Sequence, residues 1–111
     1  MNIKFIDTPK PIGNFTNVRF SGKYAYISGQ GAFDARGNLI TGKVGKDLNL
    51  DEGYEAARRV GITILSVIKN DIGFDKVLKV VKILGLVNCT EDFLSQPKVI
   101  NGCSDLLVEY F

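Results

Sequence analysis

The sequence contains no histidine among its 111 residues. This absence excludes Ser-His-Asp and Cys-His catalysis, histidine metal sites and imidazole acid-base chemistry within the chain. If the protein is an enzyme, its proton transfers must use carboxylates, tyrosine, lysine, backbone groups or water.

Cysteine and long apolar runs are also scarce. The two cysteines, Cys89 and Cys103, are not spaced as CxxC, and we expect reduced thiols in the core rather than a disulfide. No stretch reaches the roughly 18 apolar residues that cross a bilayer, and no cationic segment precedes an apolar run at the N-terminus. These features predict a cytoplasmic protein that does not contact a membrane.

Charge of one sign is not concentrated anywhere in the chain. The 14 basic and 12 acidic residues give a net charge of +2, and no run of like charge is longer than a pair such as Arg58-Arg59. A nucleic-acid partner is therefore not favoured. A hydrophobic fraction of 45% and a charged fraction of 23% fit one globular domain over residues 1–111.

The most informative segment runs from Phe15 to Gln30. Two short apolar runs flank Ser21-Gly22-Lys23, a connection of hairpin length, and predict two antiparallel strands. The second run stops at Ser28-Gly29-Gln30, where a hydroxyl, an unhindered backbone and an amide can bind a small polar group. A strand that simply bends at its glycines explains the same residues.

Two helices are indicated by apolar residues at three- and four-residue intervals. The first is expected from Asn49 or Asp51 to about Asn70, and the small residue Gly61 predicts its close approach to a sheet. The second begins at Ser95 or Gln96. The apolar stripes consist of Tyr54, Ala57, Gly61, Ile64, Leu65 and Ile68 in the first helix and of Val99, Ile100, Cys103, Leu106, Leu107 and Tyr110 in the second.

Further strands are expected on both sides of the first helix. Residues 3–6 predict a short first strand, and the glycine-rich residues 31–49 predict a loop with a short strand at 38–41. Residues 76–88 are rich in valine, isoleucine and leucine, which predicts a long central strand covered on both faces.

The order of these elements, together with Ser28-Gly29-Gln30, resembles the Rid family of reactive enamine/imine deaminases, also called the YjgF-type family. There a Gly-Pro-Tyr-like element precedes the hairpin, at the distance that separates Phe15 from Ser28 here. The resemblance thus implies that Phe15 occupies the position of the pocket tyrosine. The family's second helix carries a ligand-contacting asparagine in a Val-Asn-Ala-like context, which Ile100-Asn101-Gly102 resembles.

The resemblance implies both a fold and a site. The fold is an α+β, chorismate-mutase-like domain, a mixed β-sheet with two helices packed on one face, and it forms homotrimers with pockets between subunits. No metal or cofactor is implied. The implied substrate contacts are Phe15, Ser28, Gly29, Gln30 and Asn101.

Members of the family continue past the second helix into two further strands. The first of these carries an Ala-Arg-Ser/Thr motif whose arginine binds the substrate carboxylate, and neither Arg58 nor Arg59 has that context. We therefore expect a single Rid-like domain that lacks its final strands, and weak or no activity from these 111 residues alone.

The implied activity is hydrolysis of a reactive enamine or imine, of the 2-iminopropanoate or 2-iminobutanoate type, to a 2-oxo acid and ammonia. An imine carbon is already electrophilic, so the site must hold a carboxylate, a water and a group that steers a proton. Two alternatives stay open. One is a non-catalytic trimer of the same fold that binds small molecules, and the other is an endoribonuclease-like activity on RNA, which the even charge balance disfavours.

Overall fold

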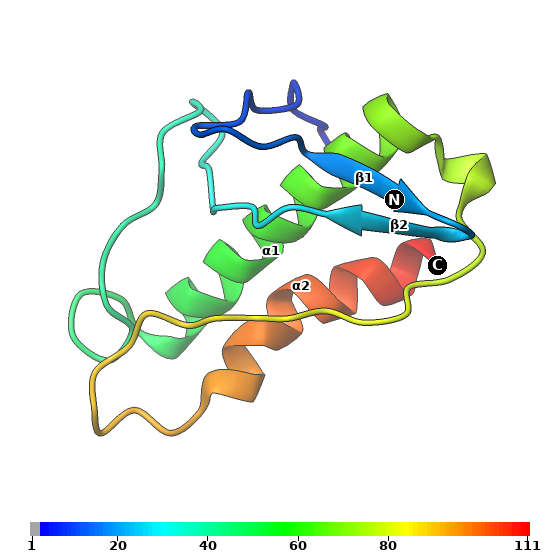
Figure 1. The fold of residues 1–111 in the computed structure, drawn as a ribbon. Coiled ribbons are helices and arrows are strands. Elements are labelled where there is room, and N and C mark those ends of the chain that lie inside the picture. The colour runs from blue at the N-terminus through cyan, green and yellow to red at the C-terminus, as the bar shows by residue number, and fades with distance from the viewer. Residues whose placement is uncertain (1–2) are drawn as a thin grey trace.

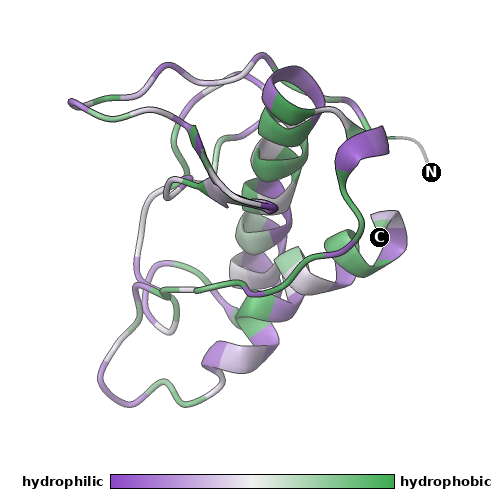
Figure 2. Ribbon diagram, turned by 45° about the vertical axis from the view of Figure 1, so that its right-hand side comes forward, coloured by the Kyte–Doolittle hydropathy of each residue, from purple (hydrophilic) through white to green (hydrophobic). Residues whose placement is uncertain are grey.

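Two helices and a β-hairpin form the regular part of the molecule, whose computed structural model describes residues 3–111. The main elements are β1 (Val18–Ser21), β2 (Tyr24–Ile27), α1 (Leu50–Val67) and α2 (Gln96–Tyr110). A π-helical turn (Ile68–Ile72) extends α1, and a 3-10 turn (Phe74–Lys76) follows it. Both helices lie on the same side of the hairpin (Figure 1 and Figure 2), which confirms the predicted α+β class.

Helix α1 begins where the sequence supplies a complete cap. The Asn49 side chain accepts a hydrogen bond from the Glu52 N–H at 2.8 Å, and the Glu52 carboxylate accepts one from the Asn49 N–H at 3.1 Å. This reciprocal pair satisfies two amides that the start of a helix leaves without partners. Gly73 ends the helical turns at a φ of 99°, which favours glycine. The predicted span of the first helix is confirmed.

The core lies between the two helices, which pack closely through small residues. Gly61 of α1 faces Leu106 and Cys103 of α2, so the expectation that Gly61 faces a sheet is wrong. The reason is that α2, rather than a strand, covers this face of α1. The buried cluster consists of Val44, Ala57, Ile62, Leu65, Val99, Cys103, Leu106 and Leu107.

The structure also bears on the predictions for the cysteines and for membrane-spanning helices. Cys89 and Cys103 are both free thiols, and Cys103 is buried in the core as predicted. Among the described residues, no helix is both long enough and apolar enough to cross a membrane.

Residues 3–9 do not form the strand expected at 3–6. The Ile6 N–H donates to the hydroxyl of Ser66 in α1 at 3.2 Å. The Phe5 ring lies 5.7 Å from the Phe74 ring, between centroids, and the Lys69 ammonium lies 4.7 Å from the same Phe5 ring. Side chains of α1 and the following turns therefore hold this segment, since no strand in the described part of the chain pairs with it.

The hairpin has the predicted position and a tight turn. Val18 pairs with Ile27 at one end and Ser21 pairs with Tyr24 at the other. Gly22 in the turn has a φ of 58°, the positive value that short hairpin turns require. Residues 28–30 leave the hairpin beside the segment that precedes β1, because Val18 and Ile27 are paired at that end.

Residues 77–88 are extended but form no ladder, contrary to the predicted central strand. Gly85 lies against Ile100 of α2, whereas the neighbouring Leu84 and Leu86 are 80% and 87% exposed. Residues 83–87 thus alternate as a strand does. The apolar pattern is not matched by strand pairing, because no strand in the described part of the chain lies beside this segment.

Residues 31–49 form the expected loop. A single antiparallel bridge between Phe33 and Leu39 stands where a short strand was expected at 38–41. Further along, Val44 is buried and forms a parallel bridge with Cys89. The loop is therefore tied both to itself and to the chain that leads into α2.

Candidate functional site

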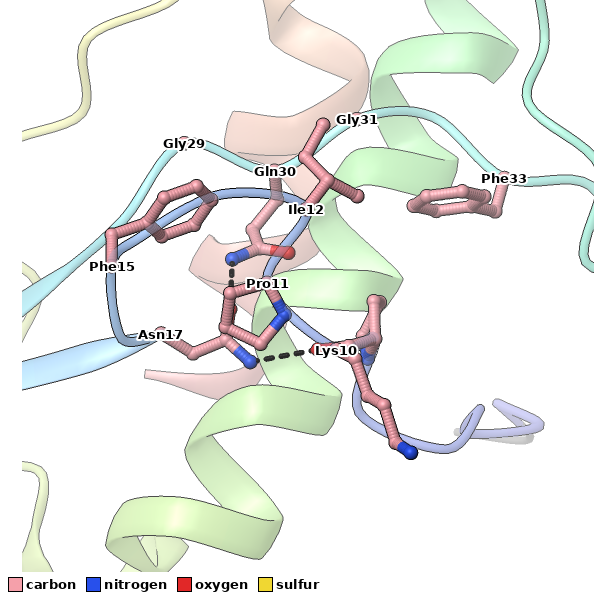
Figure 3. Close-up of a pocket in the computed structure, with 10 residues that line it drawn as sticks. Lys10, Pro11, Ile12, Phe15, Asn17, Gly29, Gln30, Gly31 and Phe33 are labelled. Carbon is pink, nitrogen blue, oxygen red and sulfur yellow. Dashed lines mark hydrogen bonds between the residues drawn. The ribbon is translucent and has the colours of Figure 1, made fainter.

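A small hollow opens where β2 ends. Its walls come from the residues before the hairpin, from the hairpin entrance and from the chain after β2, and Figure 3 shows Phe15 and Phe33 on opposite sides with Ile12 between them. Its volume is about 80 Å³, which admits a molecule of only a few heavy atoms. The lining residues are Pro9, Lys10, Pro11, Ile12, Phe15, Asn17, Gly29, Gln30, Gly31 and Phe33.

Asn17 is the buried polar centre of this hollow. Its side chain donates to the Pro9 carbonyl at 2.8 Å and accepts a hydrogen bond from the Gln30 side-chain amide at 3.3 Å. Asn17 is only 8% exposed, so these bonds satisfy an amide that water cannot reach easily. Asn17 therefore joins the chain before the hairpin to the chain after it and orients Gln30.

Gln30 presents a free hydrogen-bond acceptor to the hollow. Its amide nitrogen also donates to the Ser28 carbonyl at 3.1 Å, and Figure 3 shows its amide oxygen pointing away from Asn17. No described residue donates to that oxygen. An amide oxygen in this position can accept a hydrogen bond from an N–H group or from a water molecule.

Gly29 and Ser28 have different roles beside Gln30. Gly29 lines the hollow, and a Cβ atom on it would meet nothing within 4 Å, so a ligand can approach its backbone. The Ser28 hydroxyl donates to the Thr16 carbonyl, and the Ser28 N–H donates to the Asn17 carbonyl at 2.9 Å. Ser28 thus closes the end of the hairpin behind the hollow and does not line it.

The structure brings together three of the five predicted substrate contacts. Phe15, Gly29 and Gln30 line the hollow, and the Phe15 ring is 47% exposed. Asn101 is exposed on α2 and does not line the hollow of its own chain. Its role as a ligand contact stays a prediction of the family resemblance.

Asn17 and Phe33 line the hollow but do not stand out in the sequence as site residues. Asn17 stands directly before the first apolar run of the hairpin, and an amide that is buried there must find partners. Phe33 lies in a stretch that is typical of a loop and gives no such signal. Among the described residues that line the hollow, Lys10 is the only ionisable one, and in Figure 3 its ammonium points away from Gln30.

Two groups with shifted pKa values lie outside the hollow. The Tyr54 hydroxyl donates to the Asp105 carboxylate at 2.7 Å, and this bond raises the pKa of Tyr54 above its usual value. Burial raises the pKa of the Cys103 thiol. Neither residue lines the hollow, so the site depends on amide and backbone groups rather than on these two side chains.

Known proteins match the chain over nearly its whole length. A family model described as "YjgF/chorismate mutase-like, putative endoribonuclease" matches residues 3–111. Protein TCP17 of Trypanosoma cruzi is 33% identical over 112 residues, which cover 100% of this chain and 70% of TCP17.

Solved structures show the same fold. A crystal structure of a protein from Shewanella oneidensis MR-1, described as a "putative endoribonuclease", has a TM-score of 0.92 at 26% identity, over 97% of this chain and 72% of that one. Atu1372 of Agrobacterium tumefaciens, whose function is unknown, has a TM-score of 0.78 at 30% identity, over 90% of this chain and 65% of that one. The predicted chorismate-mutase-like fold is confirmed, in a chain shorter than these relatives.

Proposed function

The chain belongs to the YjgF/chorismate mutase-like family, and on that premise we propose that it hydrolyses a small 2-imino acid at the hollow beside β2. The products are a 2-oxo acid and ammonia. The observation that carries this proposal is the meeting of the Gln30 amide, the Gly29 backbone and the Phe15 ring at one small hollow. Its volume of about 80 Å³ suits a substrate with few heavy atoms, such as 2-iminopropanoate.

The reaction needs little from the protein beyond position. Water adds to the C=N carbon, the C–N bond of the resulting carbinolamine breaks, and the nitrogen leaves as ammonia. The Gln30 amide oxygen can hold the attacking water or the imine N–H, because no described residue occupies it. The Phe15 and Phe33 rings lie on either side and give the hollow apolar walls.

We propose a homotrimer in which a neighbouring subunit completes the hollow. Leu78, Leu84 and Leu86 are 97%, 80% and 87% exposed, and the backbone of residues 78–87 forms no hydrogen bond with the rest of the described chain. An exposed apolar strand with unpaired amides favours pairing with another chain. A partner there could also supply the carboxylate-binding cation that the hollow does not hold.

Binding without turnover is the second candidate function. The observation in its favour is that Lys10 is the only ionisable group of the lining, so the described hollow holds no carboxylate or thiol to transfer a proton. RNA cleavage, which the family model and the Shewanella protein are described with, is the third candidate. The same observation places it last, since cleaving RNA needs acid-base groups and several phosphate-binding cations.

A coupled assay tests these candidates. A serine dehydratase generates 2-aminoacrylate, which tautomerises to 2-iminopropanoate, and the release of pyruvate and ammonia is followed with and without the protein. We expect faster release with the wild-type protein. In Gln30→Ala the hydrogen bond with Gln30 is lost, so the increase in release that the protein causes should fall about tenfold. Lys23→Ala, in the distant hairpin turn, serves as the matched control.

Each outcome separates the candidates. Equal rates with and without the protein contradict hydrolysis. If 2-oxobutanoate still shifts the NMR signals of Gly29 and Gln30, binding without turnover is supported. Cleavage of a single-stranded RNA that is lost in Lys10→Ala would support the third candidate instead.

A further inference from the structure

We infer that Arg59 is a positioning residue for the hollow, because its guanidinium fixes Phe33, which forms one wall. Arg59 lies in the middle of α1 and does not line the hollow itself. The inference rests on the proposed function, since it assigns a role in a site whose ligand is also proposed.

The contact is short and charged. The Arg59 Nε–H donates to the Phe33 carbonyl oxygen at 2.7 Å, across 26 positions of the sequence, and both residues are partly buried. A hydrogen bond from an ionised donor is shorter and stronger than a neutral one, and partial burial shields it from competing water. Arg59 therefore holds the backbone at Phe33 in one place.

The loop that carries Phe33 is closed on itself. The Ile40 N–H donates to the Ala32 carbonyl and the Asp34 N–H donates to the Asn38 carbonyl, each at 2.8 Å. The Asp34 carboxylate also accepts the Asn38 N–H at 2.9 Å. Residues 32–40 thus form a small unit with its own hydrogen bonds.

One hydrogen bond of the described residues joins this unit to a helix, and it is the bond from Arg59 to Phe33. Bonds within the unit close it but do not fix its distance from the rest of the site, and a loop without an anchor opens more often, which exposes its amides to exchange. The Arg59 contact supplies that second constraint, so it sets the position of the Phe33 ring opposite Phe15 (Figure 3).

Phe33 also separates the hollow from a wider one. The second hollow, of about 420 Å³, lies between residues 4–9 and residues 33–37, and Pro9 and Phe33 line both. Releasing Phe33 would therefore let the small hollow widen toward the larger one. Arg59 is expected to govern the size of ligand that the site accepts as well as its affinity.

The chain offers a matched control in the neighbouring arginine. Arg58 is on the same helix and pairs at the surface with Glu55 at 3.5 Å, without a bond to the loop. The test compares Arg59→Met, Arg59→Lys and Arg58→Met in the full chain. Amide hydrogen exchange reports on the loop at Asp34 and Ile40, and NMR titration measures binding of 2-oxobutanoate and of the bulkier 4-methyl-2-oxopentanoate.

We expect Arg59→Met to weaken 2-oxobutanoate binding about tenfold and to speed exchange at Asp34 and Ile40 by a similar factor. Binding of the bulkier acid should weaken less, so that selectivity for the small acid falls. Arg59→Lys should restore part of both losses, because lysine keeps a charged donor. Arg58→Met should leave the loop exchange and both affinities unchanged.

Two results would overturn the inference. The first is that the wild-type protein binds 2-oxobutanoate but Arg59→Met has the same affinity and selectivity as Arg58→Met. The other is unchanged exchange at Asp34 and Ile40 in Arg59→Met, which would show that Arg59 does not hold the loop. If the wild-type protein binds neither acid, the proposed function fails, and the exchange data still decide whether Arg59 positions Phe33.

Discussion

Gly102 of α2 lies directly against the backbone of Tyr54 in α1, where a Cβ atom on residue 102 would overlap the Tyr54 carbonyl oxygen and lie 3.0 Å from the Arg58 nitrogen. The obstacle is backbone, which cannot turn aside as a side chain can. The close crossing of the two helices therefore depends on glycine at this position, and this crossing builds the core on which the loop of the hollow rests.

Replacing Gly102 with alanine should be strongly destabilising. The added methyl group would push α2 away from α1 and open the packed cluster around Leu65, and overpacking of this kind costs about 3 kcal/mol. Urea unfolding should show a free energy of unfolding lower by that amount. Gly29→Ala is the matched control, because its Cβ meets nothing within 4 Å. Equal stability of the two variants would contradict the crossing described above.

The cap of α1 gives a second, smaller prediction. Asn49→Ala removes the acceptor for the Glu52 N–H, and loss of an N-cap of this type costs about 1 kcal/mol. Thermal or urea unfolding measures the difference. Asn101→Ala, at an exposed position inside α2, should not destabilise the protein, because alanine favours helix more than asparagine does. A loss in Asn101→Ala equal to that in Asn49→Ala would rule out the cap as the cause.

Local patterns in the sequence predict the hairpin and both helices, because turns, caps and apolar stripes act over a few residues. Long-range pairing is what the sequence does not reveal. Residues 77–88 have the apolar content of a covered strand, yet the described chain places no strand beside them. Whether such a run joins a sheet depends on partners far away in the chain or in another chain.

The residues of the candidate site likewise differ in whether local sequence patterns predict them. Gly29 and Gln30 are predicted because a strand end places them locally. Asn17, by contrast, is recognised only once the Pro9 carbonyl and the Gln30 amide lie on either side of it. The contact of Arg59 with Phe33 joins residues 26 positions apart, and no periodicity in the sequence indicates such a pair.

The Tyr54 hydroxyl predicts a dependence on pH. Its hydrogen bond to Asp105 raises the pKa of Tyr54, so the folded protein holds this proton more tightly than the unfolded chain. The contribution to stability is therefore present below the usual tyrosine pKa of about 10 and is lost as the pH rises through the folded value. In Asp105→Asn, Tyr54 should ionise at lower pH than in the wild type.

Ultraviolet titration of tyrosinate measures this shift. The titration curve of Tyr54→Phe is subtracted, which removes the signals of the other tyrosines. The difference in stability between the wild type and Asp105→Asn should shrink in alkaline solution. Identical titration curves for Tyr54 in the two proteins would show that the bond to Asp105 has no effect on the proton.

Asn17 is expected to support both stability and binding. Asn17→Ala leaves the Pro9 carbonyl and the Gln30 amide without this partner, and a lost buried hydrogen-bond partner costs about 1 to 3 kcal/mol. Urea unfolding and titration with 2-oxobutanoate measure the two effects. Asn88→Ala removes an exposed amide with a long 3.4 Å bond, and it should change stability by less than about 0.5 kcal/mol. Wild-type affinity in Asn17→Ala would argue against a role in orienting Gln30.

The exposed apolar segment predicts the assembly of the protein. Leu84 and Leu86 are 80% and 87% exposed in one chain, so lysines at both positions should leave the fold of that chain intact and prevent apolar pairing with a neighbour. Sedimentation velocity should give a trimer for the wild type and a monomer for the double variant Leu84→Lys/Leu86→Lys.

Val108→Lys is the control for this double variant. It alters a residue that is 77% exposed on α2, and it should remain trimeric. A wild-type monomer at high concentration would contradict the proposed trimer, and a trimer of the double variant would place the subunit contact elsewhere. If the monomeric double variant also fails to bind 2-oxobutanoate, the hollow requires its neighbour, because residues 84 and 86 do not line it.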